Sequence, residues 1–181
     1  MRRSLVLVFV SVSVLVGCGG TTREVAIEPD VQLTVRFRDA QWDGREVPVD
    51  GRCRQCGGRG RSPALLIGGL PPTAEDVIVE FNDLRLPDLA RHGGHGALAV
   101  ATGGLTEILL PSVNEETMSL PAGVRCERPH RCNMYGHKAG AYKAPCSCGQ
   151  GNRYAATVLA VRRDGGKTVV LARAEVSLGV F

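Results

Sequence analysis

The chain has 181 residues, of which 44% are hydrophobic and 22% are charged. This composition suits one domain with a sizeable core, and it excludes a disordered or collagen-like chain. The 22 Lys and Arg against 18 Asp and Glu give a formal net charge of +4, which is too weak an excess to favour nucleic acid without a clustered basic surface.

The N-terminal segment has the pattern of a bacterial lipoprotein signal. Residues 1–17 contain a basic pair and an apolar run that closes on Leu15, Val16 and Gly17, and Cys18 follows. The apolar run is about a dozen residues, whereas a membrane span needs roughly 20, so we expect a signal peptide. The order of the last four residues resembles the lipobox, in which the cysteine takes a diacylglycerol (a palmitate-bearing anchor) and becomes the first mature residue.

A lipid on Cys18 would place the protein in the bacterial cell envelope, with the membrane as its partner. Gly19 follows, and the absence of Asp there favours the outer membrane, with the protein facing the periplasm. We expect residues 18–28 to form a short polar tether. An ordinary secretory signal or an uncleaved anchor is the alternative.

The mature chain has the pattern of an all-β domain with few short helices, over residues 29–181. Apolar and polar residues alternate without a fault along 31–37, which predicts a half-buried strand. Asp164 and Gly165 predict a hairpin turn. The further expected strands are 77–81, 96–101, 107–110, 154–161 and 168–176.

The segment 52–61 carries four Arg among Gly residues. It lacks the ending of a P-loop and has no aromatic residues for base stacking. A solvated loop tethered by disulfides is therefore favoured over a phosphate or nucleic-acid loop.

Five motifs in order resemble the bacterial branch of the phosphatidylethanolamine-binding protein family. An Asp-Gly turn and a Val-Pro pair lie within residues 43–48, and Ser-Pro-Ala-Leu at 62–65 ends a Gly-rich turn. YKAPC at 142–146 is similar to the family's YxGPxP, and GNRY at 151–154 is similar to its GxHRY. The closing segment 171–181 ends, as in the family, in Gly, one residue and an aromatic.

The resemblance implies two packed antiparallel sheets and a shallow pocket that takes phosphate, acetate or a phospholipid headgroup. It implies a binding protein that needs no cofactor. Carried over motif by motif, the candidate ligand-binding residues are Asp83, Arg85, His95, Tyr142, Pro145, Asn152 and Tyr154.

Departures from the family pattern fall mostly on this pocket. Arg85 stands where the family has the second Asp of DxDxP, and Asn152 stands for the histidine of GxHRY. Asn cannot titrate near neutral pH, so proton-linked capture at that position is lost. Arg85 could contact an anion or pair with Asp83. A turn-capping Asp83, a solvent-exposed His95 and a core-packed Tyr154 remain the structural alternatives.

Six cysteines remain if Cys18 is lipidated, and an even number in an oxidising compartment favours disulfides. They are Cys53, Cys56, Cys126, Cys132, Cys146 and Cys148. Zinc is the alternative, but only one CxxC pair is present, so we expect no metal. Glycines follow that pair directly, which disfavours the helix that a thiol oxidoreductase needs.

We expect no free thiol and two kinds of bridge. One joins Cys126 to Cys132. The other ties the CxxC loop to the Cys146–Cys148 loop, because both loops flank the pocket in the family layout.

The sequence therefore predicts a lipid-anchored, non-catalytic protein that binds a small anion or a phospholipid headgroup. It shows no Ser/His/Asp set and no paired carboxylates of an enzyme. The alternative is a structural or interaction lipoprotein that uses the fold as a disulfide-stapled scaffold with a decayed pocket.

Overall fold

A computed structural model describes residues 23–27, 31–133 and 136–181 of the chain. The predicted signal peptide and Cys18 lie outside these residues. Among the described residues, no helix is long and apolar enough to cross a membrane.

The described chain is built from strands and two single-turn 3-10 helices, as predicted. The strands are β1 (Arg23–Val25), β2 (Thr34–Phe37), β3 (Leu65–Gly68), β4 (Asp76–Asp83), β5 (Ala97–Ala101), β6 (Glu107–Leu110), β7 (Val124–Arg128), β8 (Arg153–Asp164) and β9 (Lys167–Val180). The 3-10 helices are η1 (Val49–Gly51) and η2 (Arg54–Cys56).

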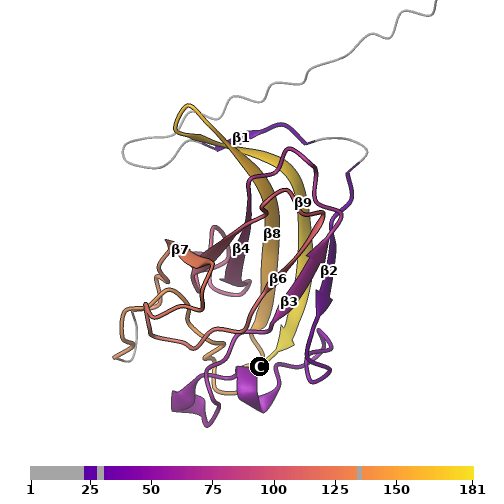
Figure 1. Ribbon diagram of the computed structural model, residues 1–181. Coiled ribbons are helices and arrows are strands. Elements are labelled where there is room, and N and C mark those ends of the chain that lie inside the picture. The colour runs from indigo at the N-terminus through magenta and orange to yellow at the C-terminus, as the bar shows by residue number, and fades with distance from the viewer. Residues whose placement is uncertain (1–22, 28–30, 134–135) are drawn as a thin grey trace, which may run out of the picture.

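The strands form two sheets that pack face to face (Figure 1). The larger sheet has the order β1-β9-β8-β4-β5-β7, and the smaller has the order β2-β3-β6. Neighbouring strands are antiparallel except β1 and β9, which are parallel. The predicted fold class is confirmed.

The core lies between the sheets, and strand patterning explains it. The predicted alternation in 31–37 holds, because Leu33 is buried and Val35 and Phe37 pack against the core while Thr34 and Arg36 face out. β4 is buried along its whole length because it lies between β5 and β8 with both faces covered. Such a strand needs apolar residues on both sides, as its Val-Ile-Val run provides.

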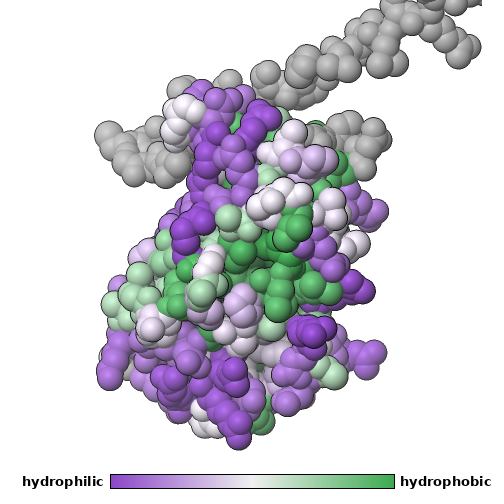
Figure 2. Space-filling view, viewed as in Figure 1, coloured by the Kyte–Doolittle hydropathy of each residue, from purple (hydrophilic) through white to green (hydrophobic). Residues whose placement is uncertain are grey.

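The outer face of the smaller sheet keeps some apolar surface. Figure 2 shows hydrophobic residues gathered over the middle of this face. Leu109 on β6 is exposed and lies opposite Leu66 on β3, which is half-buried. This cross-strand pair faces away from the core.

The β8–β9 hairpin turns one residue later than predicted. Asp164 pairs with Lys167, so the two-residue loop is Gly165–Gly166 rather than Asp164–Gly165. Both loop glycines have positive φ, 53° and 82°. This type of tight hairpin loop needs positive φ at both central positions, and two glycines adopt it without steric cost.

Part of the segment predicted as a tether belongs to the large sheet. Arg23 on β1 aligns with Thr168 on β9, and its guanidinium lies 2.6 Å from Glu80 on β4. The short strands β1, β3 and β7 were not predicted, since none has a long alternating pattern.

Candidate ligand-binding site

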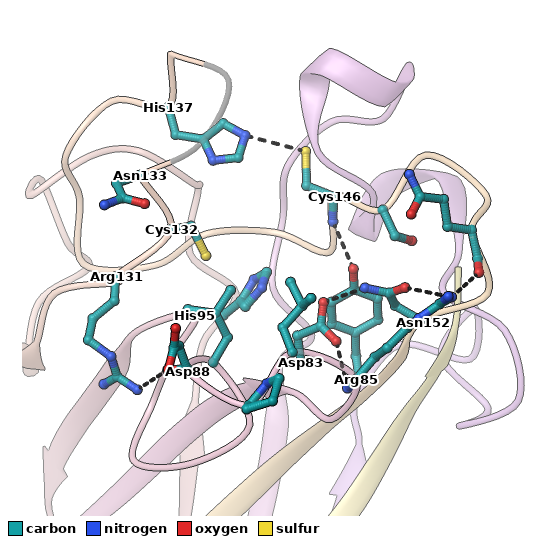
Figure 3. A pocket seen from close by; sticks show the side chains of 16 residues that line it. Asp83, Arg85, Asp88, His95, Arg131, Cys132, Asn133, His137, Cys146 and Asn152 are labelled. Atoms are coloured by element: carbon teal, nitrogen blue, oxygen red, sulfur yellow. Dashed lines mark hydrogen bonds between the residues drawn. The ribbon is translucent and has the colours of Figure 1, made fainter.

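A cavity of about 690 Å³ opens at the end of the large sheet where β4 ends and β8 begins (Figure 3). Its volume lies within the range typical of small-molecule sites. Five of the seven residues predicted from the sequence line it. They are Asp83, Arg85, His95, Asn152 and Tyr154.

Strand pairing brings these residues together from distant parts of the sequence. Asp83 is the last residue of β4 and aligns with Tyr154 on β8. Asn152 immediately precedes β8, and Arg85 follows β4 by two residues. His95 is placed just before β5 by a hydrogen bond from its backbone N–H to the Phe81 carbonyl (2.9 Å).

A chain of hydrogen bonds joins Arg85, Asn152 and Asp83. The Asn152 amide donates to Asp83 Oδ2 at 2.7 Å, and Asn152 Oδ1 accepts from the Arg85 guanidinium at 3.4 Å. The same guanidinium nitrogen donates to the Gln150 carbonyl at 2.6 Å. Arg85 therefore lines the cavity and reaches Asp83 through Asn152. The Asn152 amide has both a donor and an acceptor, so it can bond to Asp83 and to Arg85 at the same time.

Asp83 also takes the role of a turn residue. Its Oδ1 accepts from the backbone N–H of Arg85 at 3.0 Å. The side chain is only 2% exposed, so the carboxylate is both a local cap and part of the cavity wall.

His95 is buried, which corrects the solvent-exposed alternative. It is 4% exposed, and its Nδ1 lies 2.9 Å from the Lys143 carbonyl oxygen. A carbonyl can only accept, so Nδ1 carries the proton and Nε2 is an acceptor in the neutral ring. Burial lowers the pKa of His95 to about 4, so the ring is neutral near pH 7.

We expect His95 to make the fold acid-sensitive. Its pKa is about 4 when folded against 6.5 as the ordinary value, so the unfolded chain binds the proton first as the pH falls. The free energy of unfolding therefore keeps its full value, as far as His95 is concerned, above pH 6.5. It falls progressively toward pH 4, by roughly 3 kcal/mol. Urea unfolding at several pH values measures this loss. His95→Gln should flatten the profile, whereas His92→Gln, at an exposed position, should change it little. Equal slopes in wild type and His95→Gln would contradict this assignment.

Tyr154 serves both the core and the cavity. Its ring packs edge-on against His95 with the centroids 5.5 Å apart, and its hydroxyl accepts from the Cys146 backbone N–H at 3.2 Å. Burial raises the pKa of Tyr154 to about 12, so the hydroxyl stays protonated.

The other two predicted residues lie outside the cavity lining. Tyr142 is fully buried, and its ring packs edge-on against Phe81 at 4.8 Å. Pro145 is buried, and its carbonyl accepts from the Cys53 backbone N–H at 2.9 Å. Both belong to the segment that leads to Cys146, which does line the cavity.

Two structural supports of the site had no signal in the sequence. Arg131 donates to the carbonyls of Asp88, Arg91 and His92, which holds the glycine-rich loop before β5. Lys143 is 1% exposed and lies between the carboxylates of Glu115 (2.9 Å) and Glu116 (2.8 Å). A lysine in a loop motif looks like a solvated residue, so sequence reasoning missed it.

Two disulfides tie the CxxC loop to the Cys146–Cys148 loop, and this prediction is confirmed. They join Cys53 to Cys146 and Cys56 to Cys148, and Cys146 also lines the cavity. The covalent link therefore runs directly behind the site.

The predicted Cys126–Cys132 bridge is wrong, because both thiols are free. Cys126 lies on β7 opposite Leu98 and packs against the core. Cys132 lies beyond the strand, lines the cavity and donates its S–H to the Gly94 carbonyl at 3.7 Å. The two side chains thus have separate environments, which an even cysteine count cannot reveal.

We expect two thiols per chain when the protein is denatured without reductant. In the native protein, Cys132 should react slowly with a thiol reagent, because burial raises the pKa of this thiol to about 12. Thiol titration with and without denaturant measures both quantities. A count of zero under denaturing conditions would show that the two cysteines pair after all.

Comparisons with known proteins support the fold. No protein-family model and no curated protein sequence matches this chain. The crystal structure of E. coli YbcL, titled a new member of the mammalian PEBP family, is similar with a TM-score of 0.53 and 17% identity over 82% of this chain and 97% of that chain. The structure of CT736 from Chlamydia trachomatis, titled a putative phosphatidylethanolamine-binding protein homologue, is similar with a TM-score of 0.52 and 19% identity over 82% of this chain and 96% of that chain.

These structural neighbours define the class of fold as that of the phosphatidylethanolamine-binding proteins. At such low identity the likeness concerns the fold. The ligand must therefore be argued from the residues of this chain's own cavity.

Proposed function

We propose that this protein is a lipid-anchored component of the bacterial envelope that binds a small anionic or phospholipid-headgroup ligand without catalysing a reaction. One observation carries the proposal: a cavity of about 690 Å³ in which strand pairing gathers a carboxylate, a neutral imidazole and a guanidinium. The names of the two structural neighbours agree with a headgroup ligand.

The polarity of the cavity favours a ligand with both charges. The buried Asp83 carboxylate and His95 Nε2 are acceptors, while the exposed Arg85 guanidinium is a permanent donor. An ammonium group suits the acceptors, and a phosphate suits the guanidinium. Phosphoethanolamine combines the two groups on a short linker.

Calorimetry with phosphoethanolamine, inorganic phosphate and acetate tests the proposal. We expect phosphoethanolamine to bind more tightly than phosphate. His95 stays neutral and Arg85 stays charged between pH 5.5 and 8, so acetate should bind equally at both pH values, and any change for the two phosphate compounds should follow their own second ionisation. Arg85→Ala should weaken the binding of both phosphate compounds. Asp83→Asn should weaken the binding of phosphoethanolamine more than that of phosphate. Arg36→Ala, on the distant outer face of β2, is the control.

A scaffold without a ligand is the second candidate function. It is favoured because polar groups of the cavity already have hydrogen-bond partners within the protein. Arg85 donates to Gln150 and Asn152, and His95 Nδ1 donates to the Lys143 carbonyl. Absence of any heat or thermal shift at millimolar ligand would leave this scaffold function and reject ligand binding.

The anchor is tested separately. Cys18→Ala should abolish incorporation of labelled palmitate and release the protein from the membrane fraction, because the thiol of that residue is the acceptor of the lipid. A variant that still partitions into detergent like the wild type would contradict lipidation.

A further inference from the structure

Three sulfur atoms lie close together at the cavity residue Cys146. The Sγ atoms of Cys53, Cys56 and Cys146 all lie within 4.8 Å of one another. The fourth sulfur, Cys148 Sγ, is bonded to Cys56 but lies outside this group, so it must move inward to complete a four-sulfur site. The two disulfides therefore touch, with Cys56 Sγ and Cys146 Sγ only 3.9 Å apart.

The contact between the two bridges has the spacing of a tetrahedral zinc site. Four thiolates bind Zn²⁺ at about 2.3 Å, which puts neighbouring sulfurs about 3.8 Å apart. The contact between the two bridges already has this separation, 3.9 Å. A disulfide holds its sulfurs about 2.0 Å apart, so each bonded pair needs to open by about 1.8 Å, less than 1 Å per sulfur.

The backbone of the CxxC loop places both of its sulfurs on one side. η2 forms a single turn in which the Cys56 and Gly58 N–H groups both donate to the Cys53 carbonyl at 3.0 Å. Gly57 follows with φ of 80° and has open space where a side chain would lie. A glycine is thus needed there for the backbone conformation. The turn directs the side chains of Cys53 and Cys56 toward Cys146.

We propose that the four cysteines Cys53, Cys56, Cys146 and Cys148 form a zinc site when their disulfides are reduced. Two molecules of a dithiol reductant each pass two electrons and two protons to one bridge and become disulfides themselves. Both S–S bonds break and four thiols form. Binding of one Zn²⁺ then makes four Zn–S bonds and releases four protons.

The site has two states with the same loop connection. Either form, two disulfides or one zinc, holds the CxxC loop against the Cys146–Cys148 loop. Cys146 lines the ligand cavity and its backbone N–H holds the Tyr154 hydroxyl, so the metal would replace the bridges as the support of that wall.

Zinc binding by the reduced protein tests the proposal. The chain without its signal peptide is treated with dithiothreitol under anaerobic conditions, loaded with ZnCl₂, and desalted. We expect one zinc per chain in the reduced protein and none in the oxidised protein. Titration in weak buffer should release four protons per zinc, and Co²⁺ should show the charge-transfer bands of tetrahedral thiolate coordination.

Matched variants locate the ligands. Cys56→Ser and Cys148→Ser should lose stoichiometric zinc, whereas the double variant Cys126→Ser/Cys132→Ser should keep it. His137→Ala should also keep it, although His137 Nε2 lies 3.8 Å from Cys146 Sγ. The proposal would be overturned if His137→Ala lost the cobalt thiolate bands while Cys148→Ser kept them. That result would show that His137, and not Cys148, binds the metal.

Folding of the reduced chain provides the second readout. If reduction unfolds the protein, added zinc should restore the far-ultraviolet circular dichroism of the sheet and protect four cysteines from alkylation. A reduced chain that binds less than one zinc per two molecules, folded or unfolded, would reject the site.

Discussion

Removal of both disulfides is expected to destabilise the protein by more than the sum of the two single losses. The bridges close loops of nearly the same length, with separations of 93 and 92 residues. On the chain-entropy account, loss of one bridge leaves the long loop closed and costs about 2 kcal/mol, while loss of both opens it and costs about 7 kcal/mol.

Urea unfolding of three alanine variants measures this coupling, with EDTA present to exclude metal. One variant replaces both Cys53 and Cys146 by alanine, the second replaces both Cys56 and Cys148, and the third replaces all four cysteines. A domain of this size has a total stability of about 5–15 kcal/mol, so the quadruple variant should be largely unfolded at 37 °C. The control is Cys126→Ala/Cys132→Ala, which leaves both bridges. A quadruple loss equal to the sum of the two pair losses would contradict the shared-loop explanation.

Lys143→Met is expected to cost about 3–5 kcal/mol, because it leaves the buried Glu115 carboxylate without its cation. The Lys143 ammonium lies 2.9 Å from Glu115, and both side chains are at most 1% exposed. Glu115 also accepts from the Arg54 backbone N–H at 2.8 Å, so its disturbance would reach the CxxC loop.

A compensating variant separates charge from packing. Lys143→Met/Glu115→Gln should recover much of the lost stability, since the neutral amide keeps an oxygen for the Arg54 N–H. Lys138→Met, which changes an exposed lysine on the same segment, should shift stability by less than about 0.5 kcal/mol. Thermal and urea unfolding measure the stabilities of these variants. A double variant no more stable than Lys143→Met would exclude charge burial as the cause.

The sequence predicted the fold where the strands have strong patterns. Alternation in 31–37 and the long apolar run that became β4 are signals of burial, and both strands formed. β7 carries charged residues at a sheet edge, and β1 is three residues long. Their pairing depends on the neighbouring strand more than on their own composition, so local pattern could not show them.

The site was only partly predictable, because its polar contacts join residues far apart in the chain. The order of motifs placed Asp83 and His95 correctly at one end of the sheet. The direction of Arg85 depends on the Gln150 carbonyl, 65 residues away. The burial of Lys143 depends on two glutamates from another loop. Likewise, cysteine parity predicted that Cys126 and Cys132 would pair, but Cys126 lies on β7 against the core, whereas Cys132 lies beyond this strand and lines the cavity.

The parallel pairing of β1 with β9 determines at which end of the domain a membrane tether would attach. β1 joins the hairpin end of β9, while the C-terminal end of β9 lies at the cavity, where Asn152 and Phe181 exchange backbone hydrogen bonds (Figure 1). The 13 steps from Thr168 to Phe181 span about 40 Å at roughly 3.3 Å each, whereas the five from Cys18 to Arg23 reach at most about 18 Å. A molecule that stood upright on a lipidated Cys18, with β9 along the membrane normal, would therefore hold its cavity out of reach of the lipids beneath it. In that orientation it would meet ligands that diffuse in the aqueous space or have already left a bilayer.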